Sequence, residues 1–288
     1  MTRWDCGLLS SRQAELVSGW LHSPEMVADL SWGIVDSTVL HVRADGADLI
    51  VKAGGPTNHH LGREIDAHDG ATASLIARGL AAPLRHADRS ARVLVLDRLP
   101  GMLVAGSESE HDPDVHRQAG AALALLHSGD THVDPDYEER VTERTLAWLD
   151  GPHRIQRTVE NDVRRLLADQ RGSAAHVVPT HGDWQPRNWL IDQGTLRVID
   201  FGRFAYRPAC TDLCHLAGQQ WRDRPDLADA FIEGYGPDPR DAPQWPIEQL
   251  REAVGTAAYA FQIGDADFEA QGQRMLREAL RMLGGASS

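Results

Sequence analysis

HGDWQPRN, at residues 181–188, and IDFG, at residues 199–202, are the two most informative segments of this sequence. Phosphoryl transfer from a nucleotide needs a hydroxyl in line with the phosphate, a metal ion and neutralisation of the developing charge. Asp183, on a short loop, can orient the hydroxyl and accept its proton. Asn188, on the same loop, and Asp200, on the following hairpin, supply the hard oxygen ligands that Mg²⁺ prefers. The order and spacing of these three residues therefore predict a magnesium-dependent phosphotransferase.

The same segments make the sequence resemble the aminoglycoside phosphotransferase family, antibiotic kinases that share the protein-kinase fold. In that family the catalytic loop reads HGDxxxxN, and the metal-binding Asp lies in an IDFG-like block. The resemblance implies an α+β, protein-kinase-like fold of two lobes, with a small β-rich N-terminal lobe over residues 1–98 and a larger, mainly helical lobe over residues 99–288. It also implies ATP or GTP as the donor together with Mg²⁺, Asp183 as the catalytic residue, and Asn188 and Asp200 as metal ligands.

Upstream residues extend the resemblance to a nucleotide site. Lys52 in LIVKAG matches the lysine that contacts the α- and β-phosphates, and Glu64 matches the helix glutamate that pairs with it. The segment VLVLDRLPG resembles the hinge, where backbone groups of Asp97 and Leu99 would meet the adenine. Lys52 is also the only lysine among 29 basic residues. Because codon drift exchanges lysine for arginine wherever either serves, the remaining lysine indicates a place that needs a compact ammonium group.

The loop that covers the phosphates in this family is expected at residues 31–38. Ser37 and Thr38 would offer a hydroxyl or an amide to phosphate there. This loop holds one glycine, Gly33, where protein kinases have three. The resemblance therefore gives the position of the loop and little of its detail.

Several other residues around these motifs are interpreted as structural. His181 is expected to brace the catalytic loop, and Asp212 resembles the structural Asp that follows the metal block. The interval between IDFG and Asp212 is too short for an activation loop, so we do not expect a protein substrate. Cys210, Cys214 and His215 lie at helical spacing. Since no matching pair of ligands occurs elsewhere, we interpret them as part of a buried helix rather than a zinc site.

The hydrophobic pattern divides the chain into a β-rich first third and a mainly helical remainder. Alternation with period two indicates strands, and spacing of three to four residues indicates helices. A Pro-Gly pair at residues 100–101 marks the connection between the two parts, and the pair Asp45-Gly46 predicts a hairpin turn. The expected helices cover residues 9–22, 61–79, 114–129 and two segments within 137–171, and the expected strands lie within 30–53, 93–96 and 177–202.

Composition and charge limit the classes of function. The 288 residues are 42% hydrophobic and 25% charged, as in globular enzymes, and no apolar run reaches the length of a membrane span. The formal net charge of −13 argues against a nucleic-acid partner, whose phosphates require a basic face. Three cysteines and an N-terminus without signal-peptide character lead us to expect a cytoplasmic protein.

The acceptor that we expect is a small molecule with several positive charges, bound by a monomer or homodimer. Segment 223–248 contains seven acidic and two basic residues, and Asp265, Asp267 and Glu269 follow it. These helices lie where the family builds its acceptor pocket, and acidic pockets concentrate cations. The prediction is a polycationic antibiotic, an aminoglycoside or a basic cyclic peptide of the viomycin and capreomycin type, whose phosphorylation confers resistance. Trp184 is considered as a further substrate contact.

Three alternatives remain open at this point. The chain could be a metabolite kinase of the same fold, acting on choline, homoserine or a sugar, because acceptor residues lie in variable helices. It could be a nucleotide-binding pseudokinase, although the presence of Lys52, Asp183, Asn188 and Asp200 argues against a mere scaffold. A metal phosphohydrolase that uses His181 and Asp183 as ligands is the third. It would need further His and Asp clusters, which two-metal sites require and this sequence lacks.

Overall fold

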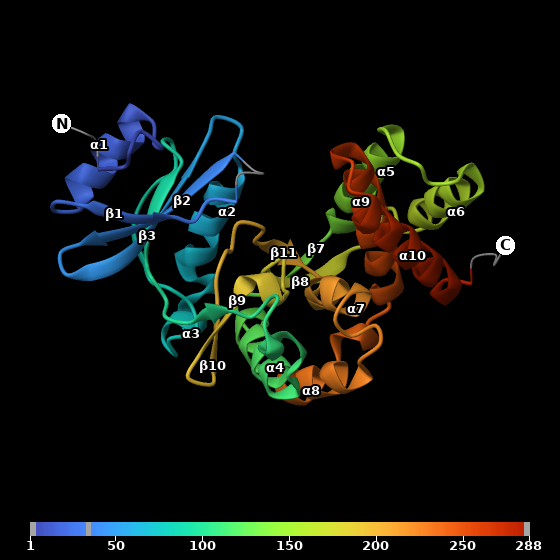
Figure 1. The fold of residues 1–288 in the computed structure, drawn as a ribbon. Coiled ribbons are helices and arrows are strands. Elements are labelled where there is room, and N and C mark those ends of the chain that lie inside the picture. The colour runs from blue at the N-terminus through green and yellow to red at the C-terminus, as the bar shows by residue number, and fades with distance from the viewer. Residues whose placement is uncertain (1–3, 33–35, 285–288) are drawn as a thin grey trace.

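The structure is a computed structural model that describes residues 4–32 and 36–284 (Figure 1). A β-rich N-terminal part is followed by a larger, mainly helical part, so the predicted α+β, two-lobed organisation is confirmed. Gly33, Ile34 and Val35, at the centre of the expected phosphate-covering loop, lie outside the described residues.

The N-terminal part is built on one antiparallel sheet with strand order β1-β2-β3-β5-β4. Asp45 and Gly46 connect β2 and β3 with φ of 53° and 75°, which is the positive-φ hairpin turn that this pair predicts. The two edge strands, β1 and β4, were not predicted. The strands are β1 (Glu25–Asp29), β2 (Ser37–Ala44), β3 (Ala47–Gly54), β4 (Leu84–Asp88) and β5 (Val93–Asp97).

Helices cover both faces of this sheet. Helix α1 (Ser11–Trp20) begins with a capping box between Ser10 and Gln13 and packs on the face that contains Val51 and Ala53. The opposite face carries α2 (His60–Asp66). Because side chains alternate along β3, Lys52 points away from α1.

The helix expected over residues 61–79 is interrupted. A π-helical turn η1 (Ala67–Ala71) and a short helix α3 (Ala73–Ile76) follow α2. The backbone leaves helical geometry at Asp69, with φ −82° and ψ 47°, and at Gly70, with φ 117°. The continuous helix was therefore a wrong prediction, and α2 forms a separate short element.

The C-terminal part contains two helix pairs and two small three-stranded sheets. Helices α4 and α8 pack together, as do α9 and α10, and the sheets have the orders β10-β9-β6 and β11-β8-β7. No helix within the described ranges is long and apolar enough to cross a membrane. The helices are α4 (Pro113–His127), α5 (Tyr137–Asp150), α6 (Arg157–Ala168), α7 (Cys214–Gly218), α8 (Pro225–Tyr235), α9 (Trp245–Ile263) and α10 (Ala266–Met282).

Short strands and 3-10 turns connect these helices and carry both motifs. Strand β8 leads into the HGD segment, and the β9–β10 hairpin leads into IDFG. The strands are β6 (Met102–Leu103), β7 (His132–Asp134), β8 (Ala175–Thr180), β9 (Trp189–Asp192), β10 (Thr195–Val198) and β11 (Ala205–Arg207), and the 3-10 turns are η2 (Glu108–His111), η3 (Pro186–Asn188), η4 (Ala209–Leu213) and η5 (Pro239–Asp241).

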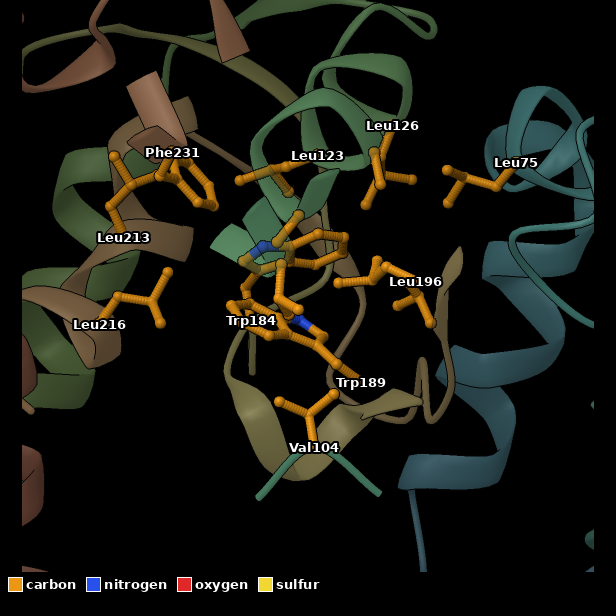
Figure 2. Close-up of a cluster of buried hydrophobic side chains, with 14 of the residues drawn as sticks. Leu75, Val104, Leu123, Leu126, Trp184, Trp189, Leu196, Leu213, Leu216 and Phe231 are labelled. Atoms are coloured by element: carbon orange, nitrogen blue, oxygen red, sulfur yellow. The ribbon is translucent and has the colours of Figure 1, made fainter. Parts of the chain in front are cut away.

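The largest hydrophobic cluster lies directly beneath the catalytic loop (Figure 2). The indoles of Trp184 and Trp189 are fully buried there, with leucines of α4 on one side and Leu75 of α3 joining from the N-terminal part. Each buried indole contributes on the order of 4 kcal/mol through apolar area removed from water. The suggestion that Trp184 contacts a substrate is therefore wrong, because its side chain belongs to the core.

Candidate active site

The buried carboxylate of Asp212 holds the backbone of the catalytic loop. It accepts the N–H of His181 at 2.8 Å and the N–H of Gly182 at 2.6 Å. Nε2 of His127 lies 3.1 Å from the same carboxylate. Burial raises the pKa of Asp212, but the hydrogen bond from His127 and nearby positive charge outweigh it, and the pKa lies below its ordinary value. Asp212 thus acts as an ionised brace, as its position suggested.

His181 is a second brace and not a base. Its ring is completely buried, Nε2 donates to the carbonyl of Ile199 at 3.0 Å, and Nδ1 accepts the N–H of Asp183 at 3.2 Å. Both ring nitrogens are thereby occupied. The imidazole connects the HGD segment to IDFG and fixes the distance between the two motifs.

Asp183 lies at the centre of a set of hydrogen-bond donors. Its carboxylate accepts from Nη2 of Arg187 at 2.8 Å and from Nδ2 of Asn188 at 2.8 Å, and also from the amide of Gln185. Nε2 of His215 lies 3.5 Å away. Only 8% of the Asp183 side chain is exposed, so little of its surface is open to an incoming hydroxyl.

The electrostatics of Asp183 favour the carboxylate form. Burial raises the pKa of Asp183, but positive charge on His215, Arg203 and Arg187 outweighs burial and holds the pKa well below its usual range. Such a carboxylate is a weak proton acceptor. Such a group can orient a hydroxyl and stabilise the positive charge that develops on a hydroxyl oxygen as it attacks, before its proton leaves.

The sequence did not reveal the roles of three residues near Asp183: His215, Glu252 and Arg187. Nδ1 of His215, on α7, lies 3.6 Å from Oε1 of Glu252 on α9, so a carboxylate, an imidazole and the Asp183 carboxylate form a line. His215 was assigned to a buried helix by its spacing to two cysteines, and no motif marks Glu252. Arg187 lies inside the HGDxxxxN block but at a position that the pattern leaves unspecified.

Lys52 connects the N-terminal sheet to the IDFG segment. Its Nζ lies 2.8 and 2.9 Å from the two carboxylate oxygens of Glu64 and 3.1 Å from Oδ1 of Asp200. Burial lowers the pKa of Lys52, but Asp200 and Glu64 outweigh it and raise the pKa above its ordinary value. Lys52 is therefore a fixed cation, and the expected pair with Glu64 is formed.

The oxygen atoms around Asn188 and Asp200 fit a magnesium ion. The Asn188 amide uses its Nδ2 to donate to the backbone and side chain of Asp183, each at 2.8 Å, which leaves Oδ1 as the available atom. Lys52 occupies one oxygen of Asp200, so the other is available. Mg²⁺ in nucleotide sites takes one or two such side chains and completes its shell with phosphate oxygens and water.

The hinge residues offer a restricted set of backbone groups. The N–H of Asp97 donates to the carbonyl of Pro83 at 3.1 Å, and the Asp97 carboxylate pairs with Arg85 at 2.6 Å. Asp97 can therefore meet an adenine only through its carbonyl oxygen. The side chain of Leu99 packs on a small cluster that includes Leu61 of α2, which fixes the backbone of the hinge.

The side chains of Ser37 and Thr38, beside the phosphate-covering loop, point in different directions. Oγ of Ser37 accepts from Nδ2 of Asn58 at 2.7 Å, next to the start of α2. Thr38 is paired with Ala53 and lines a cavity of about 320 Å³ on the α1 side of the sheet. Because Lys52 points to the opposite face, the expected contribution of the Thr38 hydroxyl to phosphate binding is wrong.

The acidic residues expected around the acceptor do not gather at Asp183. Asp265 caps α10 by accepting the N–H of Phe268 at 3.0 Å, and Asp267 lies in the first turn of the same helix. They follow the end of α9, whereas Glu252 lies in its first half. The 1.5 Å rise per residue separates these positions by about 17 Å. Asp265 and Asp267 therefore lie at the start of α10, too far from the Glu252 end of α9 to contact an acceptor at Asp183.

Most of the other acidic residues expected at the acceptor are paired with arginine. Glu269 is 9% exposed and binds Arg154 at 2.9 Å. Within segment 223–248 the pattern is similar, so little of its negative charge is left for a ligand. The pairs there are Asp223 with Arg222, Asp226 with Arg224, Glu233 with Arg117, Asp238 with Arg240, and Glu248 with Arg251.

The two buried cysteines beside His215 belong to the helical core. Burial raises the pKa of Cys210 and Cys214, which disfavours the thiolate that would bind a metal. Over residues 4–32 and 36–284, no group of three or more His, Cys, Asp or Glu side chains is arranged to hold a metal ion.

Comparisons with known proteins agree with this arrangement. The model of the phosphotransferase enzyme family matches residues 29–245, which include both motifs and Lys52. An aminoglycoside 3'-phosphotransferase of Streptomyces fradiae is 31% identical over 173 residues, an alignment that covers 53% of this chain and 64% of the relative. The matched part of the chain therefore spans less than two thirds of that relative.

Solved structures share the fold over nearly the whole chain. A thermostable mutant of aminoglycoside phosphotransferase APH(4)-Ia, in complex with AMP-PNP and hygromycin B, superposes with a TM-score of 0.71 at 15% identity and covers 96% of this chain and 100% of its own. Choline kinase LicA from Streptococcus pneumoniae gives a TM-score of 0.64 at 16% identity, with 93% and 97% covered. At these identities the likeness concerns the fold. The match of the family model over most of the sequence goes further, and the chain belongs to the phosphotransferase enzyme family.

Proposed function

We propose that the chain transfers the γ-phosphoryl group of ATP, or of GTP, to a hydroxyl of a small molecule in a magnesium-dependent reaction. The observation that carries the proposal is the convergence of two sets of side chains. Lys52 bridges Glu64 and Asp200, and Asn188 binds Asp183 with its amide nitrogen while its oxygen remains available. A regulatory scaffold would have no need for this complete set.

Each residue has a definite part in this proposal. Bound ATP would supply the transferable phosphoryl group, and Mg²⁺ would neutralise part of its charge. Lys52, held by Glu64, binds the phosphates, and the carbonyl of Asp97 receives the adenine. Asn188 and Asp200 would provide oxygen ligands for the metal ion. Residues of the IDFG segment stay in register with the catalytic loop because His181 binds the carbonyl of Ile199.

Asp183 binds the acceptor hydroxyl. It accepts a hydrogen bond from the acceptor hydroxyl and orients the oxygen toward the γ-phosphorus. The new O–P bond forms as the bond from that phosphorus to ADP breaks, and Asp183 takes the hydroxyl proton late in this step. The low pKa of this carboxylate means that the proton moves late, as expected for a loose transition state in which the nucleophile needs little activation. Orientation in the site then provides most of the rate enhancement.

The acceptor that we propose is a small cationic antibiotic. Support comes from the relative that is named an aminoglycoside 3'-phosphotransferase. A second candidate is an alcohol of metabolism such as choline, because choline kinases are among the structures that share the fold. Both candidates use the same Asp183 and the same nucleotide site, so the choice between them does not alter the mechanism.

A coupled assay of ADP release tests the proposal. The purified chain is incubated with Mg·ATP and a panel of aminoglycosides, basic cyclic peptides, macrolides, choline, homoserine and sugars, and products are weighed by mass spectrometry. We expect acceptor-dependent ADP release and one added phosphoryl group on the acceptor, with Asp183→Asn as the inactive control. Binding of Mg·ATP without transfer to any member of a broad panel would favour the pseudokinase alternative.

A further inference from the structure

Helix α2 connects three parts of the proposed nucleotide site. Glu64 holds the ammonium of Lys52, on β3, at 2.8 Å. Nδ1 of His60 lies 3.0 Å from the carbonyl of Gly202, in the IDFG segment. Four residues separate His60 from Glu64, so both lie on the same side of the helix. The contact to the third part, the described end of the phosphate-covering loop, comes from Asn58, to which the proposed function assigns no role.

The side chain of Asn58 uses its whole hydrogen-bonding capacity. Nδ2 donates to the carbonyl of Asp36 and to Oγ of Ser37, both at 2.7 Å. Oδ1 accepts the N–H of His60 at 2.9 Å and that of Leu61 at 3.2 Å. Because a carbonyl can only accept and a backbone N–H can only donate, these partners fix which end of the amide faces the loop. Asn58 is buried, so its amide is shielded from competing water.

Two consecutive glycines, at the end of β3 and directly after it, allow this close approach. A Cβ at Gly54 would lie 2.7 Å from Cβ of Asn58, and a Cβ at Gly55 would overlap the carboxylate of Asp36. The N–H of Gly55 also donates to the carbonyl of Asp36 at 3.3 Å. That carbonyl is therefore bound by two donors, a backbone N–H and the amide of Asn58.

The hydroxyl of Ser37 lies on the face of the sheet to which Lys52 points. In the β2–β3 pairing Val39 is opposite Lys52. Ser37 is two residues before Val39, and side chains two residues apart on a strand point to the same face. Since Oγ of Ser37 accepts from Asn58, its own proton can be donated elsewhere, and none of the described residues accepts it. A phosphate group bound by Lys52 would meet this donor on the same face.

We infer that Asn58 is a positioning residue for the phosphates of the nucleotide, and that it acts by orienting the Ser37 hydroxyl and holding the Asp36 carbonyl. The ligand class is the triphosphate group of a nucleoside triphosphate. This inference rests on the proposed phosphoryl transfer and concerns the binding of the donor. If Asn58 served only to cap α2, its oxygen alone would matter, because the N–H groups of the helix bind Oδ1.

The variant Asn58→Asp separates these two roles. A carboxylate keeps an oxygen for the first N–H groups of α2, where negative charge is favourable, but it cannot donate to Asp36 or Ser37. Calorimetry with Mg·AMP-PNP and the full chain should show about tenfold weaker binding than in the wild type, because two donated hydrogen bonds are lost. The midpoint of thermal unfolding should stay within about 3 °C. Equal nucleotide affinity of the wild type and Asn58→Asp overturns the inference.

Two controls address other causes of weaker binding. His59→Asp introduces the same charge at the exposed neighbouring residue, and its Kd for Mg·AMP-PNP should stay within about twofold of the wild type, because salt screens an exposed charge. Adenosine, which has no phosphate, should bind Asn58→Asp as it binds the wild type. An equal loss of Mg·AMP-PNP affinity in His59→Asp would assign the effect to charge, and an equal loss for adenosine would assign it to a general distortion. Either result contradicts the inference.

Ser37→Ala tests the same arrangement without a change to the helix. It removes the hydroxyl that Asn58 orients and leaves the bonds of Asn58 to α2 in place, so it applies even if Asn58→Asp does not fold. We expect roughly five- to tenfold weaker binding of Mg·AMP-PNP. In the double variant the two losses should be less than additive, because both substitutions act on one hydroxyl. Wild-type affinity in Ser37→Ala overturns the inference.

The inference and the proposed function can fail separately, because binding of AMP-PNP requires no acceptor. Transfer to an acceptor, together with equal nucleotide affinity in the wild type and Asn58→Asp, contradicts the inference and leaves the kinase activity standing. Weaker nucleotide binding in Asn58→Asp, together with no transfer to any acceptor by the wild type, supports the role of Asn58 and contradicts the proposed function.

Discussion

Arg187, four residues after Asp183 on the same loop, binds both carboxylate oxygens of Asp183. Its Nη2 lies 2.8 Å from Oδ2 and 2.9 Å from Oδ1. Gln185 and Asn188 bind the same carboxylate, so the acceptor hydroxyl must replace one of these donors or share an oxygen with it. Until an acceptor binds, side chains of the same loop therefore occupy the carboxylate of Asp183.

Asp183→Asn should remove turnover and keep nucleotide binding. A positioned base contributes about 10²–10⁴-fold to the rate, and the residue does not reach Lys52 or Asp200. We expect kcat to fall by that amount while the Kd for Mg·AMP-PNP stays within twofold. Asp192→Asn, which removes a carboxylate from the β9–β10 hairpin, is the matched control. A comparable kcat in both variants would remove Asp183 from the mechanism.

Arg187→Gln should move the acid side of the pH–rate profile. The active form of Asp183 is the carboxylate, so activity falls as pH drops through its pKa. Removing the positive charge of Arg187 raises that pKa toward the ordinary value of 3.8, so the loss of kcat on acidification begins at a higher pH than in the wild type. Arg197→Gln, which breaks an ion pair with Asp192, should leave the profile in place.

Lys52→Arg should be a poor replacement although it preserves the charge. The ammonium contacts two carboxylates of different elements from one point, and a planar guanidinium cannot reproduce this geometry. Loss of one charged contact corresponds to roughly 10–100-fold in kcat/KM for ATP. Wild-type kinetics in Lys52→Arg would mean that the single lysine is an accident of composition.

Removal of the metal ion should abolish activity. Removal of single metal ligands should weaken activity to different degrees. Excess EDTA should stop turnover, and added Mg²⁺ should restore it. Asp200→Ala should weaken Mg²⁺ activation more than Asn188→Ala, because the carboxylate supplies charge and the amide supplies only a dipole. The Mg²⁺ concentration that gives half-maximal activity is the measurement. An unchanged value in Asp200→Ala would place the metal ion elsewhere.

Trp184→Ala should act on stability and not on acceptor binding. The side chain is fully buried, and truncation of such an aromatic costs about 3–5 kcal/mol of the free energy of unfolding. Denaturant unfolding should show this loss, while the acceptor KM of the remaining folded protein stays unchanged. Ile263→Ala, at a half-exposed position, should change stability by less than about 1 kcal/mol.

The motifs could be recognised from sequence because each is short and makes its contacts locally. Asp183 and Asn188 bind each other across five residues, and the turn at Asp45 and Gly46 follows from backbone preferences of that pair. Strands β1 and β4 were missed because both lie at edges of the sheet. Their side chains are partly exposed throughout, so the alternation that reveals a strand is weak.

Other features depend on contacts between distant elements, which a single sequence does not contain. Trp184 is next to Asp183 in sequence yet points into the core, because the loop turns between them. Glu252 meets His215 across two helices. The net charge of −13 suggested a cationic acceptor, but pairing decides which charges are available to a ligand, and pairing is a property of the fold.

The position of Lys52 also determines how the protein responds to chemistry directed at amines. Apart from the chain's own α-amino group, Nζ of Lys52 is the single primary amine of the polypeptide, and it is enclosed by Glu64 and Asp200. Acylation, reductive methylation or aldehyde fixation of side-chain amines therefore has one target in this molecule. That target is a residue of the proposed nucleotide site. Its two carboxylate partners raise its pKa and hold it protonated, so reagents that modify the surface lysines of most proteins should leave this molecule largely unmodified.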